Sequence, residues 1–174
     1  MGKKVSITGH TKGIGLAIAN YFLNNGYLVT GFSKSNGYDI TNTSIRQQIV
    51  KESNDAVIFV NNAYNNFDNS QLEILENIYK DWEGQDKIII NISSRFTNGD
   101  NDYSQSKQKL DQFCEQKIYN RLPYLINLKP GLTNTLRVES IEGNRMEVND
   151  VVNVLDYILS HKKNIRFTTI SFGK

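Results

Sequence analysis

Tyr103 and Lys107 form the residue pair in this sequence with the clearest chemical potential. They are four residues apart at the start of a predicted helix over Asp102–Tyr119, so both lie on one helical face. A free phenol has a pKa of about 10, and an ammonium fixed nearby favours the phenolate and lowers that pKa. The pair therefore predicts a general acid/base that gives a proton to an alkoxide or takes one from an alcohol, although Tyr-x-x-x-Lys alone is common on helices.

Two further polar groups follow predicted buried strands. Ser94 ends the run Asn91-Ile92-Ser93-Ser94, where its hydroxyl could hydrogen-bond a substrate oxygen that gains negative charge. The alternative for such a serine is a helix cap or a loop hydrogen bond. The run Asn61-Asn62-Ala63 follows the strand over Ala56–Val60 and could line a crevice, or could form a simple Asx turn.

A glycine-rich loop joins the first predicted strand to the first predicted helix. Glycine permits a tight turn and close approach of the backbone to phosphate, and the helix N-terminus then favours the negative charge. The spacing is Gly-x-x-x-Gly-x-Gly, and an ordinary turn is the alternative. The histidine of the loop is expected to be solvated. The loop residues are Gly9, His10, Thr11, Lys12, Gly13, Ile14 and Gly15.

If the glycine loop binds the pyrophosphate of a nicotinamide dinucleotide, the choice between NAD(H) and NADP(H) depends on the end of the second predicted strand. A carboxylate there would bind a ribose 2′-hydroxyl and repel a 2′-phosphate. Here Ser33, Lys34 and Ser35 follow Phe32 without an acid, and Lys12 and Lys34 could pair with a phosphate. We therefore expect NADP(H) to be preferred over NAD(H), unless both lysines are merely solvated.

Alternating strands and helices must position these groups. Apolar runs that alternate with helical segments of about 10–15 residues predict an α/β fold, in which a doubly wound parallel sheet carries helices on both faces. No linker or domain boundary is evident, so we expect a single domain over residues 1–174. The predicted strands are Lys4–Thr8, Tyr27–Phe32, Ala56–Val60, Lys87–Ile92, Tyr124–Leu128 and Ile165–Ile170, and the predicted helices are Gly13–Asn25, Asn42–Glu52, Ser70–Trp82, Asp102–Tyr119 and Asn149–Ser160, the last capped by Asn149.

Composition excludes several classes of protein. The 174 residues carry a net charge of +2, which gives no electrostatic signal for nucleic acid or an anionic membrane. The single cysteine, Cys114, cannot form a disulfide framework or a cysteine zinc site and is expected to be packed rather than reactive. No apolar run is long enough to span a membrane, and no metal site is expected. A cytoplasmic protein is the default expectation, and the N-terminal match to a myristoylation pattern is disfavoured because a buried strand begins at once.

Taken together, the motifs resemble the short-chain dehydrogenases/reductases, in their compact single-domain NADP-type branch. The resemblance covers roughly Lys3 to Phe172 and implies a Rossmann fold with a single, mostly parallel sheet of about seven strands. Six signals occur in the family's order, which is far more specific than any one of them. They are Thr8-Gly9-x-x-x-Gly13-Ile14-Gly15, Asp39-Ile40, Asn61-Asn62-Ala63, Ser94, Tyr103-x-x-x-Lys107 and Pro130-Gly131-x-x-x-Thr135.

The resemblance implies a role for each motif. Tyr103 would be the general acid/base, Lys107 would lower its pKa and bind the nicotinamide ribose, and Ser94 would hold the substrate oxygen. Counting back from Ser94 points to Asn66 as the proton-relay asparagine, with Asn65 and Asn69 close by. The cofactor would be bound by the glycine loop, by Ser33 and Lys34 at the 2′-phosphate, by Asp39 and Ile40 beside the adenine, by Asn61, Asn62 and Ala63 on the ribose side, and by Pro130, Gly131, Leu132, Thr133 and Thr135 around the nicotinamide.

The sequence also departs from the family pattern. The chain is unusually short, Tyr64 replaces the glycine that usually follows Asn-Asn-Ala, and the substrate-covering lid after Thr135 is cut down. The resemblance predicts an NADP(H)-dependent oxidoreductase that interconverts a carbonyl and an alcohol on a small-molecule substrate. The alternative is a catalytically weak or inactive NADP(H)-binding redox sensor or partner-binding module. An epimerase of the family's extended branch is disfavoured, because its substrate domain has no room here. A homodimer or homotetramer is expected, with the helices over Ser70–Trp82 and Asp102–Tyr119 at the interface.

Overall fold

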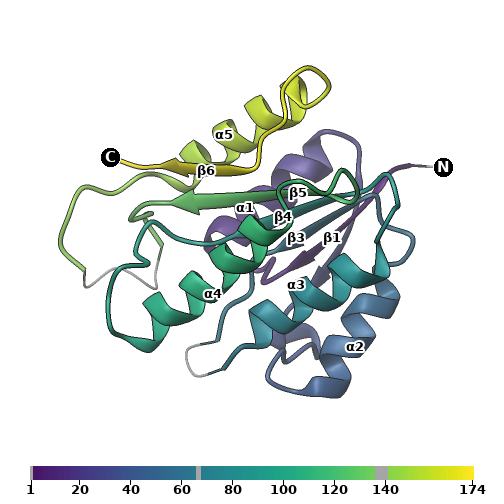
Figure 1. Ribbon diagram of the computed structural model, residues 1–174, viewed down its shortest axis with the longest axis horizontal. Helices are drawn as coiled ribbons and strands as arrows, with labels where there is room; N and C mark the ends of the chain where they lie inside the picture. The colour runs from purple at the N-terminus through teal and green to yellow at the C-terminus, as the bar shows by residue number, and fades with distance from the viewer. Residues whose placement is uncertain (1, 66–67, 136–140) are drawn as a thin grey trace.

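The computed structural model describes residues 2–65, 68–135 and 141–174. Its centre is one parallel sheet with the strand order β2-β1-β3-β4-β5-β6 (Figure 1). The predicted doubly wound parallel fold is therefore confirmed, with six strands in the described part of the chain instead of about seven. These strands are β1 (Lys4–Thr8), β2 (Leu28–Phe32), β3 (Ile58–Asn61), β4 (Ile88–Ile92), β5 (Tyr124–Pro130) and β6 (Thr169–Phe172).

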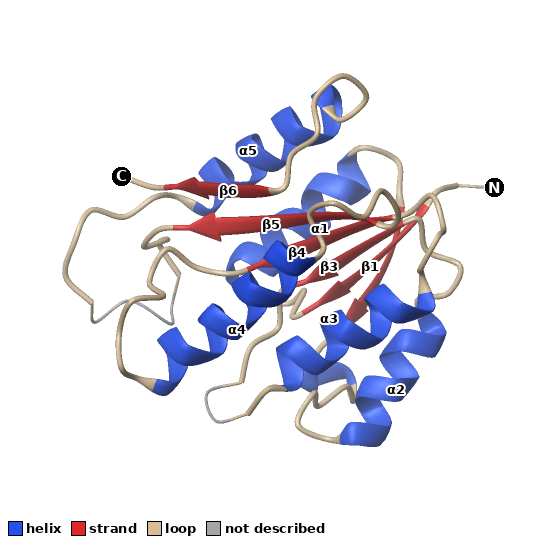
Figure 2. Cartoon of the chain, viewed as in Figure 1, coloured by secondary structure: helices blue, strands red, loops and turns tan. Residues whose placement is uncertain are grey.

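Helices cover both faces of the sheet (Figure 2). One apolar cluster joins α1 and α5 to one face, and a second cluster joins α2, α3 and α4 to the other. Both faces of β4 are buried, which explains why its sequence is nearly continuous isoleucine. The helices are α1 (Gly13–Asn24), α2 (Thr43–Glu52), α3 (Ser70–Asp81), α4 (Asp102–Gln116) and α5 (Val148–His161), and a short 3₁₀ turn, η1, spans Lys34–Asn36.

The strand order creates one point at which the winding of the chain reverses. The strand β1 lies between β2 and β3, so the connections that leave β1 and β3 diverge at the carboxyl ends of these two strands. Ligands of doubly wound sheets bind at such a crevice. The loops after β1 and β3, which carry the glycine run and Asn62-Ala63, are therefore adjacent there.

Several element bounds differ from the predicted ones, and two of these differences have a clear cause in the structure. The last strand was expected over Ile165–Ile170, but β6 begins only at Thr169. The residues before β6 are instead held by groups distant in sequence, because the guanidinium of Arg166 binds backbone carbonyls before β5 and the hydroxyl of Tyr124 accepts a hydrogen bond from the N–H of Phe167. The last helix is capped by Glu147, which forms a reciprocal capping box with Asp150, so the prediction of a cap at Asn149 was wrong.

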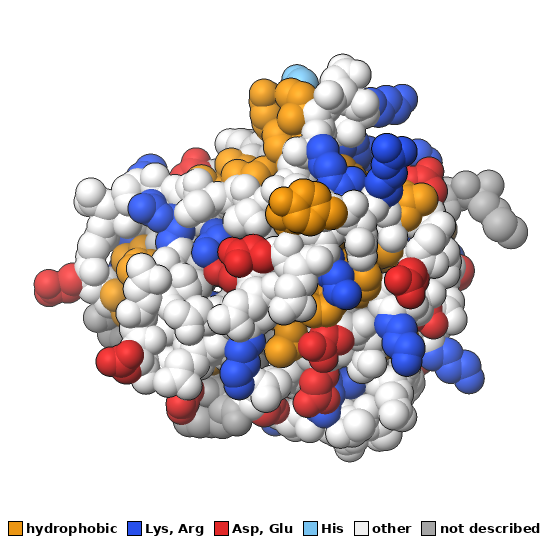
Figure 3. Space-filling view, viewed as in Figure 1, with side chains coloured by type: hydrophobic (Ala, Val, Ile, Leu, Met, Phe, Trp, Pro, Cys, Tyr) orange, Lys and Arg blue, Asp and Glu red, His pale blue; other side chains and the backbone are white. Residues whose placement is uncertain are grey.

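The surface agrees with the small net charge. Acidic and basic side chains are both spread over the face shown in Figure 3. Within the described ranges, no helix has the length and apolar character that crossing a membrane requires. Cys114 is a buried residue of α4, as expected, and burial together with the nearby carboxylate of Asp111 raises the pKa of its thiol well above the usual range.

We predict that Phe59→Ala lowers the free energy of unfolding by about 3–5 kcal/mol, because it leaves a cavity in the second apolar cluster. The Phe59 side chain is 0% exposed, and its ring packs edge-on against Trp82. Tyr119→Ala is the matched control, since Tyr119 is 90% exposed, and should change the free energy by no more than about 0.5 kcal/mol. Urea denaturation would measure both, and equal effects would contradict this account of the core.

Candidate functional site

The glycine loop forms a tight turn that larger residues could not form. Gly9 and Gly13 have positive φ angles of 70° and 53°, a backbone conformation that glycine adopts without strain. Gly15 packs so closely on the turn that a Cβ there would lie 2.1 Å from the carbonyl oxygen of Gly9. The first turn of α1 is thus pressed against the end of β1.

The loop after β3 holds this turn in place. The side-chain amide of Asn62 donates hydrogen bonds of 3.2 Å to the carbonyl oxygens of Thr8 and Gly9. In return, the Thr8 hydroxyl accepts hydrogen bonds from the backbone N–H groups of Asn62 and Ala63, at 2.9 and 3.0 Å. The Asn62-Ala63 pair therefore acts as a clasp on the glycine turn, and this contact was not specified by the sequence.

The N-terminus of α1 is open to an anion. Its N-cap residue, Lys12, makes no side-chain capping hydrogen bond, and the first turn contains no acidic residue. The N–H groups of this turn and the positive end of the helix dipole therefore suit a phosphate. Because the glycines also let the backbone approach closely, the residues present fit the pyrophosphate of a dinucleotide.

The segment after β5 reaches the same turn. Pro130 ends β5, and the N–H of Gly131 donates to the carbonyl of Phe172 at 2.8 Å. Thr133 is buried and donates its hydroxyl hydrogen to the Gly131 carbonyl at 3.0 Å. Further along, the methyl group of Thr135 lies 3.1 Å from the place a Cβ of Gly13 would take. The predicted nicotinamide segment and the glycine loop are thus in contact, as a shared cofactor site requires.

His10 is not the solvated loop residue that the sequence favoured. A Cβ on Gly31 would lie 2.2 Å from the His10 ring, so this ring packs against bare backbone of β2. The Nδ1 atom of His10 is buried and has no hydrogen-bond partner in the described residues. Gly31 is the residue that makes this packing possible, and its role was missed because it reads as an ordinary strand residue.

An acid from the following loop does reach the cation after β2. The sequence places no carboxylate directly after this strand, but the chain returns Asp39 to within 2.8 Å of the Lys34 ammonium. Hydrogen bonds from Lys34 and Thr41 lower the pKa of Asp39 to about 2. The hydroxyl of Ser33, the residue before η1, donates to the side-chain oxygen of Asn36 at 3.0 Å. A 2′-phosphate here would meet an exposed ammonium that is already paired with a carboxylate.

A buried arginine anchors the next stretch of this loop. The Arg46 guanidinium donates to the carbonyl oxygens of Ile40 and Thr41 at 2.7 and 3.0 Å, and it pairs with Glu73 of α3 at 2.6 Å. Ile40, predicted to flank the adenine, is itself buried in the core. Nothing in the local pattern around Arg46 distinguishes it from a surface residue of a helix.

The two serines after β4 have different environments. The Ser93 hydroxyl donates to the carboxylate of Asp111 on α4 at 2.7 Å. The Ser94 hydroxyl oxygen accepts a hydrogen bond from the N–H of Phe96 at 3.0 Å, and among the described residues no acceptor takes its own hydrogen. Ser94 can therefore still donate to another oxygen, whereas the hydroxyl hydrogen of Ser93 is already donated to Asp111 of α4.

The ammonium of Lys107 is buried below two aromatic rings. Its Nζ atom lies 5.6 Å from the ring centroid of Tyr103 and 4.9 Å from that of Tyr64, and these rings pack edge to face. It donates hydrogen bonds to the side-chain oxygen of Gln71, at 2.8 Å, and to the carbonyl oxygen of Ile92, at 3.1 Å. The structure thus brings Tyr103 and Lys107 together beside the end of β4.

Some predicted site residues lie elsewhere. Asn61 is fully buried, and its side-chain amide donates to the Gln71 carbonyl and to Asn91, both at 3.0 Å, instead of facing the crevice. Asn66, the predicted relay residue, lies outside the described residues. Gln71 and Asp111 are parts of the site that the sequence analysis missed, because both read as ordinary polar residues of amphipathic helices.

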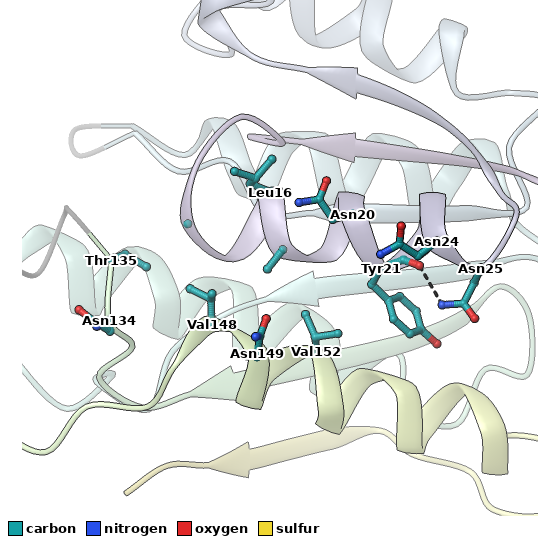
Figure 4. Close-up of a pocket in the computed structure, with 12 residues that line it drawn as sticks. Leu16, Asn20, Tyr21, Asn24, Asn25, Asn134, Thr135, Val148, Asn149 and Val152 are labelled. Carbon is teal, nitrogen blue, oxygen red and sulfur yellow. Dashed lines mark hydrogen bonds between the residues drawn. The ribbon is translucent and has the colours of Figure 1, made fainter.

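A separate groove of about 690 Å³ lies between α1 and α5, on the sheet face opposite α4 (Figure 4). Leu16 and Asn20 enter it from α1, and Val148 and Val152 enter it from α5. At one end the groove meets Gly13 and Thr135, so it is continuous with the far side of the glycine turn. It contains neither Tyr103 nor Lys107 and does not belong to the proton-transfer residues.

Solved structures with this fold are plentiful. A short-chain dehydrogenase from Burkholderia cenocepacia J2315 in complex with NADP matches with a TM-score of 0.79 and 17% identity, over 98% of this chain and 89% of that one. A 3-alpha-hydroxysteroid dehydrogenase from Pseudomonas sp. B-0831, complexed with NADH, gives 0.80 and 14%, over 98% and 94%. A 3-ketoacyl-(acyl-carrier-protein) reductase from Brucella melitensis, complexed with NADH, gives 0.80 and 15%, over 99% and 96%.

Comparisons of the whole sequence find no relative. No family model matches the chain, and no curated protein matches it. The likeness is therefore one of backbone arrangement, at identities of 14–17% over nearly the whole chain. It confirms the fold that the motifs predicted: this chain has the fold of the short-chain dehydrogenases/reductases.

Proposed function

We propose that this protein is an NADP(H)-dependent oxidoreductase that interconverts a carbonyl and an alcohol on a small molecule. The observation that carries the proposal is the buried Lys107 ammonium beside the Tyr103 ring, at the same edge of the sheet as an open, glycine-lined helix N-terminus. The fold shared with dehydrogenases that bind NADP or NADH supports it. When bound, the nicotinamide would supply or accept the hydride.

The chain's own residues would handle the proton. Tyr103 would give its phenolic proton to the substrate oxygen during reduction and take it back during oxidation. The Lys107 ammonium favours the phenolate form of a neighbouring phenol by its charge. Ser94 would donate a hydrogen bond to the same substrate oxygen. It can do so because the N–H of Phe96 uses only the Ser94 oxygen as an acceptor and does not use its hydroxyl hydrogen. The cofactor would be oriented by the glycine loop, by the Asn62-Ala63 clasp and by residues 130–135.

A second function is favoured by one observation. The Lys107 ammonium is nearer to the Tyr64 ring than to the Tyr103 ring, and Tyr64 stands where the motif resemblance expects glycine. A ring at this place narrows the space beside Tyr103. The alternative is therefore a dinucleotide-binding protein without turnover, which would bind NADPH and gain thermal stability but would oxidise no NADPH with a broad panel of aldehydes and ketones.

Tyr103→Phe should separate turnover from cofactor binding. Loss of the phenolic proton should lower kcat by roughly 10²- to 10⁴-fold, while NADPH still raises the melting temperature as in the wild type. Tyr119→Phe is the matched control, since this exposed tyrosine lies outside the site. NADPH oxidation and thermal shift would be measured side by side. Unchanged turnover in Tyr103→Phe would remove this residue from the mechanism.

Lys34 is expected to contribute to the preference for NADPH over NADH. Lys34→Ala should weaken NADPH binding by roughly tenfold and leave NADH binding unchanged, because it removes a cation from the 2′-phosphate and exposes that phosphate to the Asp39 carboxylate. The low pKa of Asp39 keeps this carboxylate ionised throughout the neutral range. Lys51→Ala, on the exposed side of α2, is the control. Isothermal titration would decide, and tighter binding of NADH by the wild type would refute the NADP(H) preference.

We also propose a homodimer or homotetramer built on α3 and α4. Leu110 and Cys114 of α4 are already buried in the core of one chain, so these two apolar side chains are not left for a partner. Phe113 is partly exposed and packs edge-on against Tyr79 of α3. Sedimentation velocity should show a species of two or four times 19.9 kDa, and a single species at the monomer mass would defeat this assignment.

A further inference from the structure

A chain of buried side-chain amides crosses the sheet beneath the candidate site. Asn61, Asn91 and Asn127 occupy matching positions on the neighbouring strands β3, β4 and β5, and all three are 0% exposed. The amide of Asn61 donates to Asn91 at 3.0 Å, and that of Asn91 donates to Asn127 at 2.8 Å. Asn127 in turn donates to the carboxylate of Asp111 at 2.8 Å, whose second oxygen lies 2.5 Å from the Lys129 ammonium.

The direction of this amide chain is fixed at both ends. An ionised carboxylate only accepts hydrogen bonds, so Asn127 must present its NH₂ group to Asp111 and its oxygen to Asn91. At the other end, the NH₂ group of Asn61 also donates to the backbone carbonyl of Gln71 at 3.0 Å. Since a backbone carbonyl cannot donate, no amide in the chain can be reversed without placing two acceptors or two donors face to face.

The orientation of the Gln71 side chain is fixed in the same way. Its Nε2 atom donates to the backbone carbonyls of Asn61 and Ile92, both at 3.0 Å. Its Oε1 atom is therefore directed at Lys107, whose Nζ atom lies 2.8 Å away. Gln71 and Lys107 are each only 3% exposed, so water cannot readily replace this contact.

We propose that Gln71 is a positioning residue, which holds the Lys107 ammonium beside the Tyr103 ring. A lysine side chain has four rotatable methylene groups, and an ammonium acts on a phenol only if its distance is kept short. Gln71 and the Ile92 carbonyl supply that restraint from below the rings. The proposal rests on the proposed function, in which Lys107 assists Tyr103, and is independent of the relay role assigned to Asn66.

The test compares Gln71→Met with the wild-type protein. Methionine has nearly the length of glutamine but offers the ammonium no oxygen. We expect kcat for NADPH oxidation to fall by roughly 10- to 100-fold, and the midpoint of the pH profile of kcat to move to higher pH, because a less well placed ammonium favours the phenolate less. A merely structural role would lower the melting temperature without moving that midpoint.

Matched variants separate position from stability. Gln105→Met, at an exposed glutamine of α4, should leave both kcat and the pH midpoint unchanged. Asn127→Leu breaks the amide chain at β5 and should lower the melting temperature, because Asn91 and Asp111 lose a buried partner. If Gln71→Met does not fold, Gln71→Asn withdraws the oxygen by one methylene and serves with the same measurements. A pH profile of the folded variant that superimposes on that of the wild type overturns the proposal.

A readout without turnover keeps this proposal distinct from the proposed function. In protein labelled with ε-¹³C-lysine, the Lys107 resonance can be assigned by its absence in Lys107→Met. This resonance should move in Gln71→Met and stay in place in Gln105→Met, whether or not the protein oxidises NADPH. An unmoved Lys107 resonance refutes the role of Gln71. A moved resonance in a protein that has no turnover refutes the oxidoreductase and leaves the positioning contact standing.

Discussion

Burial of an ammonium in an apolar interior is costly unless oxygen atoms take over the role of water, and this constraint shapes the whole site. Lys107 meets it with the side-chain oxygen of Gln71 and the carbonyl of Ile92, and its charge also faces two aromatic rings. These oxygens belong to different elements, α3 and β4, so the lysine can be accommodated only when the sheet and both adjacent helices are assembled. The charge that would assist the chemistry is therefore available only in the folded protein.

Much of the fold could be predicted because its signals are local. Apolar runs such as Lys87–Ile92 identify buried strands, and Gly26 marks the end of the first helix, where its positive φ of 76° ends the winding. The weakest predictions were those in which a distant group decides. The start of β6 depends on Tyr124 and Arg166, and the cap of α5 depends on the pairing of Glu147 with Asp150.

The candidate site divides in the same way. The motif residues Tyr103 and Lys107 are four apart on one helix, so their proximity follows from helix geometry alone. The contacts of Gln71, Asp111 and the three buried asparagines depend on strand register, which the sequence does not reveal. Asn61 illustrates this well: its place after a strand suggested a crevice residue, yet it lies in register with Asn91 of β4, to which its side-chain amide donates.

The chain of buried amides on β3, β4 and β5 also makes the protein sensitive to a very small chemical change. Deamidation replaces one NH₂ group by an oxygen and hardly alters the volume of the side chain. At Asn127 it would set an acceptor against the Asp111 carboxylate and bury a second negative charge beside it. Because these side chains are buried, deamidation would have to begin in molecules that have unfolded locally. The additional buried charge would then oppose refolding.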